Sequence, residues 1–256
     1  TGFSHANNQG VKLSKSDYVF LINPDIILDQ NCISILYQFA QMHPQGASFC
    51  GKLYKMKSIN IDPDTPGKGL KTFVKTKTID CMGLTILKNR KVINTGEGLI
   101  DNPTFDKTQQ IFGVSGCFGL YHKEALEDAK IYNEYFDENF FAYKEDVDLS
   151  WRLKILGWES WYVNNAFGYH CRGFSSPEED TTIKIKKSRK KVSRMLRSLS
   201  FKNHYLMLIK NEFLSNALIS FAPYFFREIK RLIYICLFEP FLLKDFIILF
   251  KQIPST

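Results

Sequence analysis

Three acidic residues gather within four positions of the stretch NFFAYKEDVDLSWRLKILGW, residues 139–158. Glu145, Asp146 and Asp148 follow an aromatic turn and open a predicted amphipathic helix. Acidic side chains in a first helical turn complement the helix dipole by about 0.3–1 kcal/mol each, which is an ordinary structural explanation. Apolar surroundings also raise the pKa of a carboxyl group, so that a carboxylate at a pocket rim could take the proton of a hydroxyl nucleophile.

The residues Asn23-Pro24-Asp25 close the apolar run DYVFLINPD, which we predict to be a buried strand. Ligands of open α/β sheets bind beyond the carboxyl ends of strands, and Asp25 could there hold a divalent cation that bridges a diphosphate. The same residue types also form plain turns. His170 ends another predicted strand, and a shared metal site becomes plausible if the fold places it near Asp25.

Two further segments carry weaker signals. GFSHANNQG offers two amide side chains, Asn7 and Asn8, that suit either a nucleotide site or an ordinary loop. FGVSGCFGLY contains Gly113, Gly116 and Gly119. Glycine within a strand marks the close approach of a ligand or of another backbone, and tight packing or a bulge explains it equally well.

Strand and helix signals alternate along the first 170 residues, a pattern typical of an α/β fold. We read residues 57–77 as a polar loop with proline and glycine. The other predicted elements are a strand at 17–25, a helix at 29–44, strands at 46–55, 78–87 and 91–100, a glycine-containing strand followed by a helix from about Lys123, a helix from about Glu145 to Leu156 capped by Gly157, and two short strands within 159–173.

The composition points to a folded protein with an anionic partner. The chain has 256 residues, 45% of them hydrophobic, and a net charge of +8, which favours phosphate groups, nucleic acid or an acidic membrane surface. Six scattered cysteines without a CxxC pair suit a reducing compartment. After about Ser175 the chain becomes basic and then rich in Phe, Leu and Ile, which suits an anionic membrane surface better than nucleic acid. A solvated basic helix over an ordinary helical core is the alternative.

Taken together, these motifs resemble a bacterial family 2 glycosyltransferase of the rhamnosyltransferase-like type. The matching segments are GFSHANNQG, YVFLINPDIIL, GVSGCFGLYHKEAL and EYFDENFFAYKEDVDLSWRLKILGWESWYVNNAFGYHCRG, in the family's order. The resemblance implies a GT-A fold, a Rossmann-like mixed sheet flanked by helices, over residues 1–178. A basic, amphipathic helical tail over 179–256 would follow. The family's first strand-helix-strand precedes GFSHANN, so we expect this sequence to lack it and to bind the donor weakly or not at all.

The resemblance also implies roles for individual residues. Asp146 matches the general base of the family. Asp25 and His170 match its metal ligands, with Asn23 in place of the first Asp of an Asp-x-Asp motif. On the same basis the donor side would contain Asn7, Asn8, Asn23 and Asp25, and the acceptor side Gly116, Glu145 and Trp151.

The implied activity is an inverting, metal-dependent transfer of a sugar from a nucleotide-diphosphate sugar to a glycan or lipid-linked acceptor. The setting would be cell-surface polysaccharide synthesis, in the cytoplasm at the inner face of the plasma membrane. Such a reaction needs a base on the acceptor hydroxyl and Mg²⁺ or Mn²⁺ on the leaving diphosphate, but no second carboxylic acid. The alternative is an inactive remnant that binds membrane or glycan. Nucleic-acid binding rests on charge alone and is not expected.

Overall fold

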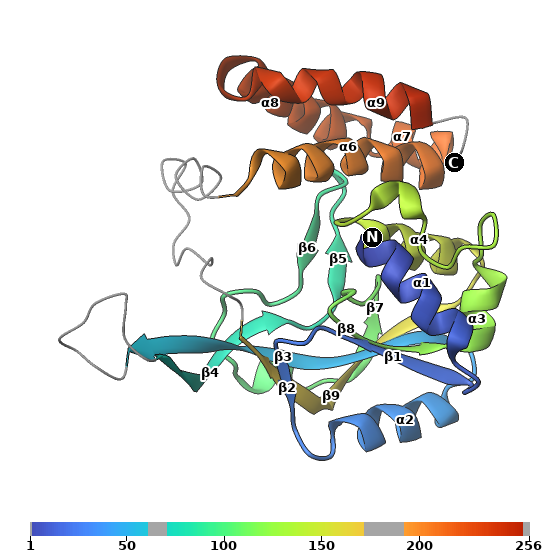
Figure 1. Cartoon of the computed structure of the whole chain (residues 1–256), viewed down its shortest axis with the longest axis vertical. Coiled ribbons are helices and arrows are strands. Elements are labelled where there is room, and N and C mark those ends of the chain that lie inside the picture. Colours follow the sequence, from blue (N-terminus) through green and yellow to red (C-terminus); the bar gives the residue numbers. More distant parts are fainter. Residues whose placement is uncertain (1, 61–70, 172–191, 253–256) are drawn as a thin grey trace.

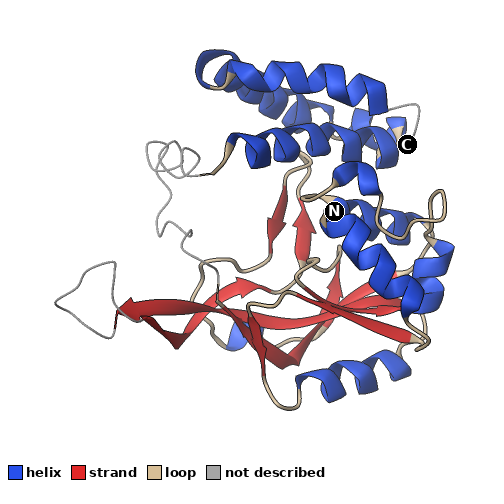
Figure 2. Ribbon diagram, in the orientation of Figure 1, coloured by secondary structure: helices blue, strands red, loops and turns tan. Residues whose placement is uncertain are grey.

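A mixed β-sheet forms the centre of the molecule in a computed structural model that describes residues 2–60, 71–171 and 192–252. Its strand order is β1-β8-β3-β9-β2, with β4 paired to β3 and β7 paired to β9. Figure 2 shows helices on both sides of the strands. The strands are β1 Tyr18–Ile22, β2 Ile26–Leu28, β3 Gly46–Asn60, β4 Lys71–Cys81, β5 Leu84–Ile86, β6 Val92–Asn94, β7 Gln109–Ile111, β8 Phe118–His122 and β9 Glu159–His170.

The helices divide into a group beside the sheet and a C-terminal group. Figure 1 shows α2 on one side of the sheet, α1, α3 and α4 on the other, and the C-terminal helices stacked at one end of the molecule. The helices are α1 Phe3–Leu13, α2 Cys32–Met42, α3 Lys123–Asp128, α4 Glu145–Ile155, α6 Arg194–Asn211, α7 Leu214–Ile219, α8 Phe221–Phe238 and α9 Asp245–Gln252, with short 3-10 helices η1 Pro103–Phe105, η2 Glu138–Phe140 and η3 Pro240–Lys244.

Most of the predicted elements are confirmed, because their signals are local. Helix α2 buries Cys32, Leu36 and Ala40 completely, a stripe at the spacing of four expected for one face of a helix. Helix α4 begins at Glu145 as predicted. Gly157, with a φ of +88°, occupies the left-handed position that commonly ends a helix.

Several predicted boundaries are wrong, including that of the strand predicted at 78–87, which is divided between β4 and β5. The predicted loop at 57–77 is strand at both of its ends, since β3 runs to Asn60 and pairs antiparallel with β4 from Lys71. Residues 61–70 lie outside the described part. The two short strands predicted within 159–173 are one strand, β9, which is paired with β3 along one edge and with β2 and β7 along the other. Its register shifts between the partners of Cys50 and Lys52, where two polar residues, Asn164 and Asn165, interrupt the apolar pattern.

Two glycines are closely packed, and one of them, Gly113, lies against Ser150 of helix α4. A Cβ atom on Gly113 would overlap the side chain of Ser150, and one on Gly119 would lie 2.8 Å from atoms of Val114 and Tyr121. Tight packing therefore explains these two glycines, which was one of the two interpretations left open by the sequence.

The C-terminal helices share a hydrophobic core with α4. Their tail was predicted to begin at 179, a position outside the described residues. Trp151 of α4 and Phe140 of η2 pack with residues of α6 and α9. No helix in the described ranges is long and apolar enough to cross a membrane. The buried members of this core are Leu84, Phe140, Val147, Trp151, Leu206, Met207, Leu208 and Leu249.

Candidate active site

The pairing of β2 with β9 places Asp25 beside His170. Ile26 pairs with His170 in the register, and the Cys171 N–H donates to the Asp25 carbonyl oxygen at 2.8 Å. The Nε2 atom of His170 lies 3.3 Å from Oδ1 of Asp25. The structure thus brings together the two residues that the sequence proposed as metal ligands.

A third acidic residue, Asp80 at the end of β4, completes this arrangement. Its Oδ2 atom lies 2.8 Å from Nδ1 of His170, and its side chain is fully buried. A carboxylate at Nδ1 favours the tautomer with a proton there, so that the Nε2 lone pair faces Asp25. The sequence analysis did not identify Asp80, although an acidic residue inside the β-like run TIDCMGLTIL is an unusual feature.

Asp25 and His170 together fit a divalent cation. A nitrogen lone pair and a carboxylate oxygen 3.3 Å apart repel each other unless a proton or a cation lies between them. In the described ranges no group of three or more His, Cys, Asp or Glu side chains could hold a metal ion. Of the described residues, Asp25 and His170 could contribute two ligands, and a diphosphate and water could supply others.

The carboxylate of Asp146 is fixed at the start of α4 by two backbone donors. The Gly116 N–H donates to Oδ2 at 3.0 Å, and the Val147 N–H donates to Oδ1 at 2.8 Å. The residue is partly exposed, so a hydroxyl group can approach it. A Cβ atom on Gly116 would lie 3.0 Å from Phe3 and 3.4 Å from Asp146, which gives this glycine a packing role as well.

Glu145 differs from its neighbour because it is buried. Its residue exposure is 6%, and Oε2 has no hydrogen-bond partner in the described part of the chain. Burial, and secondarily the charge of Asp146, raises the pKa of Glu145 to about 8. The carboxyl group is therefore mostly protonated at neutral pH, and its burial leaves little room for a hydroxyl group to approach it.

Asp148 has a structural role. Its fully buried carboxylate accepts hydrogen bonds from Arg152 Nε at 2.9 Å and from Asn211 Nδ2 at 2.8 Å. Because Asn211 belongs to α6, this acid joins α4 to the C-terminal helices. Of the three acids in the stretch, Asp146 combines exposure with a fixed orientation.

The segment 115–117 connects the two groups of residues. The Asn23 N–H donates to the Cys117 carbonyl oxygen at 2.9 Å, while the Gly116 N–H reaches Asp146. This contact exists because Ile22 at the end of β1 pairs with Phe118 at the start of β8. The turn that carries Asp25 and the helix that carries Asp146 therefore bond to adjacent residues of one short segment.

Other predicted site residues are engaged within the fold. The side chain of Asn8, which is 1% exposed, accepts from the N–H groups of Tyr135 and Phe136 and donates to Phe136 and Glu138, which leaves it no atom for a nucleotide. Asn7 donates to the carbonyl of Phe3 in its own helix. We therefore reassign Asn8 from donor binding to fold stability.

Trp151, predicted on the acceptor side, lies in the core between α4 and α6. Its exposure is 9%, and its ring contacts Phe112 edge to face at a centroid distance of 6.0 Å. An acceptor could reach only a small part of this side chain. Its position one helical turn beyond Asp146 is explained by packing, because α4 turns this face toward α6.

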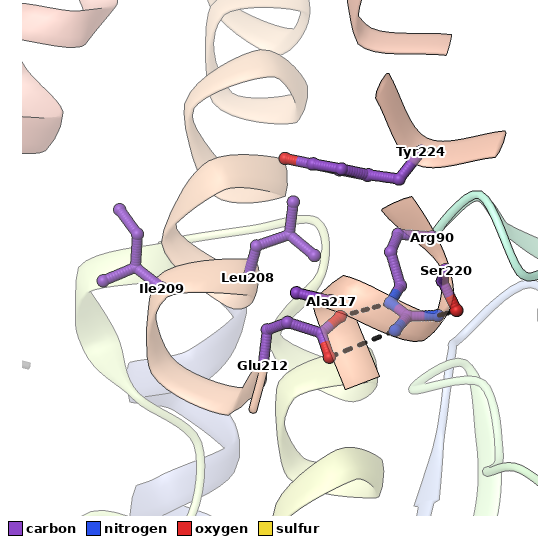
Figure 3. A pocket seen from close by; sticks show the side chains of 7 residues that line it. All are labelled: Arg90, Leu208, Ile209, Glu212, Ala217, Ser220 and Tyr224. Atoms are coloured by element: carbon purple, nitrogen blue, oxygen red, sulfur yellow. Dashed lines mark hydrogen bonds and ion pairs between the residues drawn. The ribbon is translucent and has the colours of Figure 1, made fainter. Parts of the chain in front are cut away.

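A cavity of about 210 Å³ lies elsewhere, between α6, α7, α8 and the tip of the β5–β6 hairpin. Figure 3 shows Arg90 of the hairpin reaching Glu212 and Ser220 beside it. None of the predicted site residues lines this cavity, and its walls are mostly apolar. The cavity therefore lies apart from the polar groups around segment 115–117. Its lining residues are Arg90, Leu208, Ile209, Glu212, Ala217, Ser220 and Tyr224.

Comparison with known proteins supports the architecture. No protein-family model matches the chain, and no curated protein matches it. Among solved structures it is similar to one described as GalNAc-T7 with UDP, GalNAc and Mn²⁺, at 8% identity and a TM-score of 0.51. The match covers 81% of this chain and 34% of that chain, so this chain spans about a third of its structural neighbour. The chain has the predicted GT-A fold, a mixed sheet flanked by helices and followed by a helical C-terminal segment.

Proposed function

We propose that this protein is a glycosyltransferase that moves a sugar from a nucleotide-diphosphate sugar to an acceptor hydroxyl. The observation that carries the proposal is the arrangement around segment 115–117, where Asn23 bonds to Cys117 and Asp146 bonds to Gly116. The turn that carries the candidate cation ligand Asp25 and the candidate base Asp146 thus both bond to one short segment of a GT-A fold. The neighbour's bound UDP and Mn²⁺ support a nucleotide-sugar donor and a divalent cation.

Asp146 is the base in this proposal. An acceptor hydroxyl approaching its exposed side would transfer a proton to the carboxylate as the oxygen attacks the sugar carbon from the face opposite the diphosphate. Attack from the opposite face inverts the configuration at that carbon. The two N–H donors hold the carboxylate in one orientation, which reduces the entropy lost on reaching the reactive arrangement.

Asp25 and His170 would hold Mg²⁺ or Mn²⁺ together with the donor diphosphate. When bound, the cation would offset the negative charge that builds on the leaving diphosphate. Asp80 has an indirect role, since its carboxylate fixes the ring of His170. Asn23, at the start of the same turn, would contribute to the donor side, as would the partly exposed Asn7.

The acceptor would be a glycan or lipid-linked sugar of a cell-surface polysaccharide, bound near Gly116 and Glu145 with the edge of Trp151. We place the reaction in the cytoplasm, at the inner face of the plasma membrane. The support is an exposed apolar stripe on α8, at intervals of three and four residues, with exposed lysines in α8, η3 and α9. The exposed apolar residues and lysines of the C-terminal helices include Leu214, Leu218, Ile219, Phe225, Phe226, Ile229, Lys230, Ile233, Leu237, Lys244, Ile247, Ile248, Phe250 and Lys251.

Vesicle sedimentation tests this membrane contact. The protein should sediment with phosphatidylglycerol vesicles and much less with phosphatidylcholine vesicles, since both apolar insertion and charge contribute. The double substitution Phe226→Ser and Ile233→Ser should abolish sedimentation. Equal binding to both vesicle types, or a stable dimer that covers the stripe, would contradict the membrane proposal.

Substitution of Asp146 tests the enzyme. We expect Asp146→Asn to lower the rate of nucleotide release with acceptor by about 10²–10⁴-fold, the usual contribution of a general base, while Mn²⁺ binding and thermal unfolding stay unchanged. Asp128→Asn is the control, because that exposed acid bonds only to Trp158 among the described residues. Near-normal turnover in Asp146→Asn would exclude the assigned base. If the wild-type protein binds glycan but shows no turnover, the alternative function, a glycan-binding module, would be favoured.

A further inference from the structure

The residues just before Asp146 adopt backbone conformations that are unfavourable for residues other than glycine. Phe141, Tyr143 and Lys144 have φ values of +61°, +71° and +75°. Residues other than glycine rarely adopt positive φ angles. Such conformations persist only where the surrounding structure imposes them. Lys144 directly precedes α4, so its conformation sets the direction in which the first turn of the helix starts.

Asn203 of α6 bonds to this segment from outside. Its Nδ2 atom donates to the carbonyl oxygens of Phe140, Ala142 and Tyr143 at 2.8, 2.9 and 2.7 Å. An amide group has two hydrogens, so one of them is shared between two acceptors. The side chain of Asn203 is fully buried, and no water can take its place without a rearrangement.

Other polar residues of α6 also bond to the chain on both sides of Asp146. Lys202 Nζ donates to the Asn139 carbonyl oxygen at 2.8 Å, and Lys210 forms an ion pair with Asp137. Beyond Asp146, Asn211 binds Asp148 at 2.8 Å. One helix therefore bonds to the chain before and after the candidate base.

We propose that Asn203 is a positioning residue for Asp146, acting through the backbone of residues 140–144. The proposal rests on the proposed function, in which Asp146 is the base. If Asn203 loses its donor, the three carbonyl groups seek other partners and the strained residues relax. The start of α4 then shifts, and the carboxylate of Asp146 leaves the orientation defined by Gly116. The donor side is spared, because Asp25 and His170 are held by β2 and β9.

Two variants separate this role from plain stability. Asn203→Leu keeps the side-chain size and removes the donors. His204→Leu is the matched control, since His204 is the next residue, is 3% exposed, and lies 3.3 Å from Glu228 and 3.1 Å from Arg227, both on α8. Amide hydrogen exchange reports on the segment without any assay of activity. We expect the amides of residues 140–145 to exchange at least about tenfold faster in Asn203→Leu and to be unchanged in His204→Leu.

Steady-state kinetics test the catalytic consequence. With a panel of UDP-, GDP- and dTDP-sugars and Mn²⁺, we expect kcat to fall about 10–100-fold in Asn203→Leu, as a misplacement near 1 Å can cause. The donor KM should stay within about twofold, and Asn203→Ser, which keeps one donor, should recover part of kcat. His204→Leu should keep the wild-type kcat.

The outcomes separate the two proposals. If amide hydrogen exchange of residues 140–145 is unchanged in Asn203→Leu, Asn203 does not stabilise this segment. Faster exchange with unchanged kcat in an active enzyme overturns the positioning role. A wild type that releases no nucleotide from any donor overturns the proposed function and the catalytic part of this proposal, while exchange still decides whether Asn203 holds the segment.

Discussion

The buried carboxyl group of Glu145 should make the protein less stable as pH rises. Burial raises its pKa from the ordinary value of 4.5 to about 8, the charge of Asp146 adds to the rise, and Lys144 opposes it. The folded state then binds a proton more tightly than the unfolded state. The cost of ionising this group in the fold is absent below pH 4.5, grows as pH rises, and is complete above about pH 8.

The size of the effect follows from the two pKa values. Each pH unit between 4.5 and about 8 is worth about 1.4 kcal/mol, which sets a ceiling of about 5 kcal/mol at alkaline pH. Local relaxation and water entry reduce the penalty of a buried charge but leave a substantial part of it. We therefore expect at least about 2 kcal/mol of the free energy of unfolding to depend on this one group.

The substitution Glu145→Gln isolates this cost, because an amide of the same shape does not ionise. Urea unfolding at pH 5.5, 7.0 and 8.5 gives the free energy of unfolding of both proteins. The stability of the variant minus that of the wild type should increase with pH, by up to about 3 kcal/mol across this range. Glu127→Gln is the control, because a hydrogen bond from Lys130 lowers the pKa of Glu127. The free energy of unfolding of this variant minus that of the wild type should therefore stay constant above pH 5.5. A difference for Glu145→Gln that does not change with pH would refute the assignment of a neutral, buried acid.

Two other substitutions test the site and the packing beneath it. Asp80→Asn removes the charge next to Nδ1 of His170 and should weaken Mn²⁺ binding about 10–100-fold. Free Mn²⁺ can be measured by electron paramagnetic resonance during a titration. An unchanged Mn²⁺ affinity would exclude an orienting role for Asp80. Gly113→Ala should lower the free energy of unfolding by about 1–3 kcal/mol because the new methyl group overlaps Ser150, whereas Gly10→Ala, with nothing within 4 Å, should be neutral or stabilising. Equal stability of these two glycine variants in urea unfolding would contradict the packing argument.

Local patterns in the sequence account for much of the fold. The apolar spacing of α2, the start of α4 and the turn after β1 all depend on residues within a few positions of each other. The hypothesis that Asp25 and His170 could share a site was correct about their proximity, but the strand predicted at 17–25 is β1, which pairs with β8. Asp25 lies beside His170 because β2, a short strand that the sequence analysis did not predict, pairs with β9.

The remaining features depend on partners far apart in the chain. Asp80 meets His170 across 90 positions, and Asn8 meets Phe136 across 128. Asn203 meets Tyr143 across 60 positions, and nothing in the composition of α6 distinguishes it from other polar helix residues. Such contacts arise from how elements pack, so residue type alone cannot separate a buried asparagine that organises the backbone from one that binds a ligand.

The contacts of α6 have a consequence for how this protein could change during evolution. An appended module can be exchanged between proteins when few interactions cross its boundary. Here the polar residues Lys202, Asn203, Lys210 and Asn211 all bond to the chain around Asp146, and the apolar residues between them fill the core beside Trp151. A recombination event that replaced the C-terminal helices would replace these partners too. We therefore expect the two regions to diverge together, by paired substitutions across their boundary.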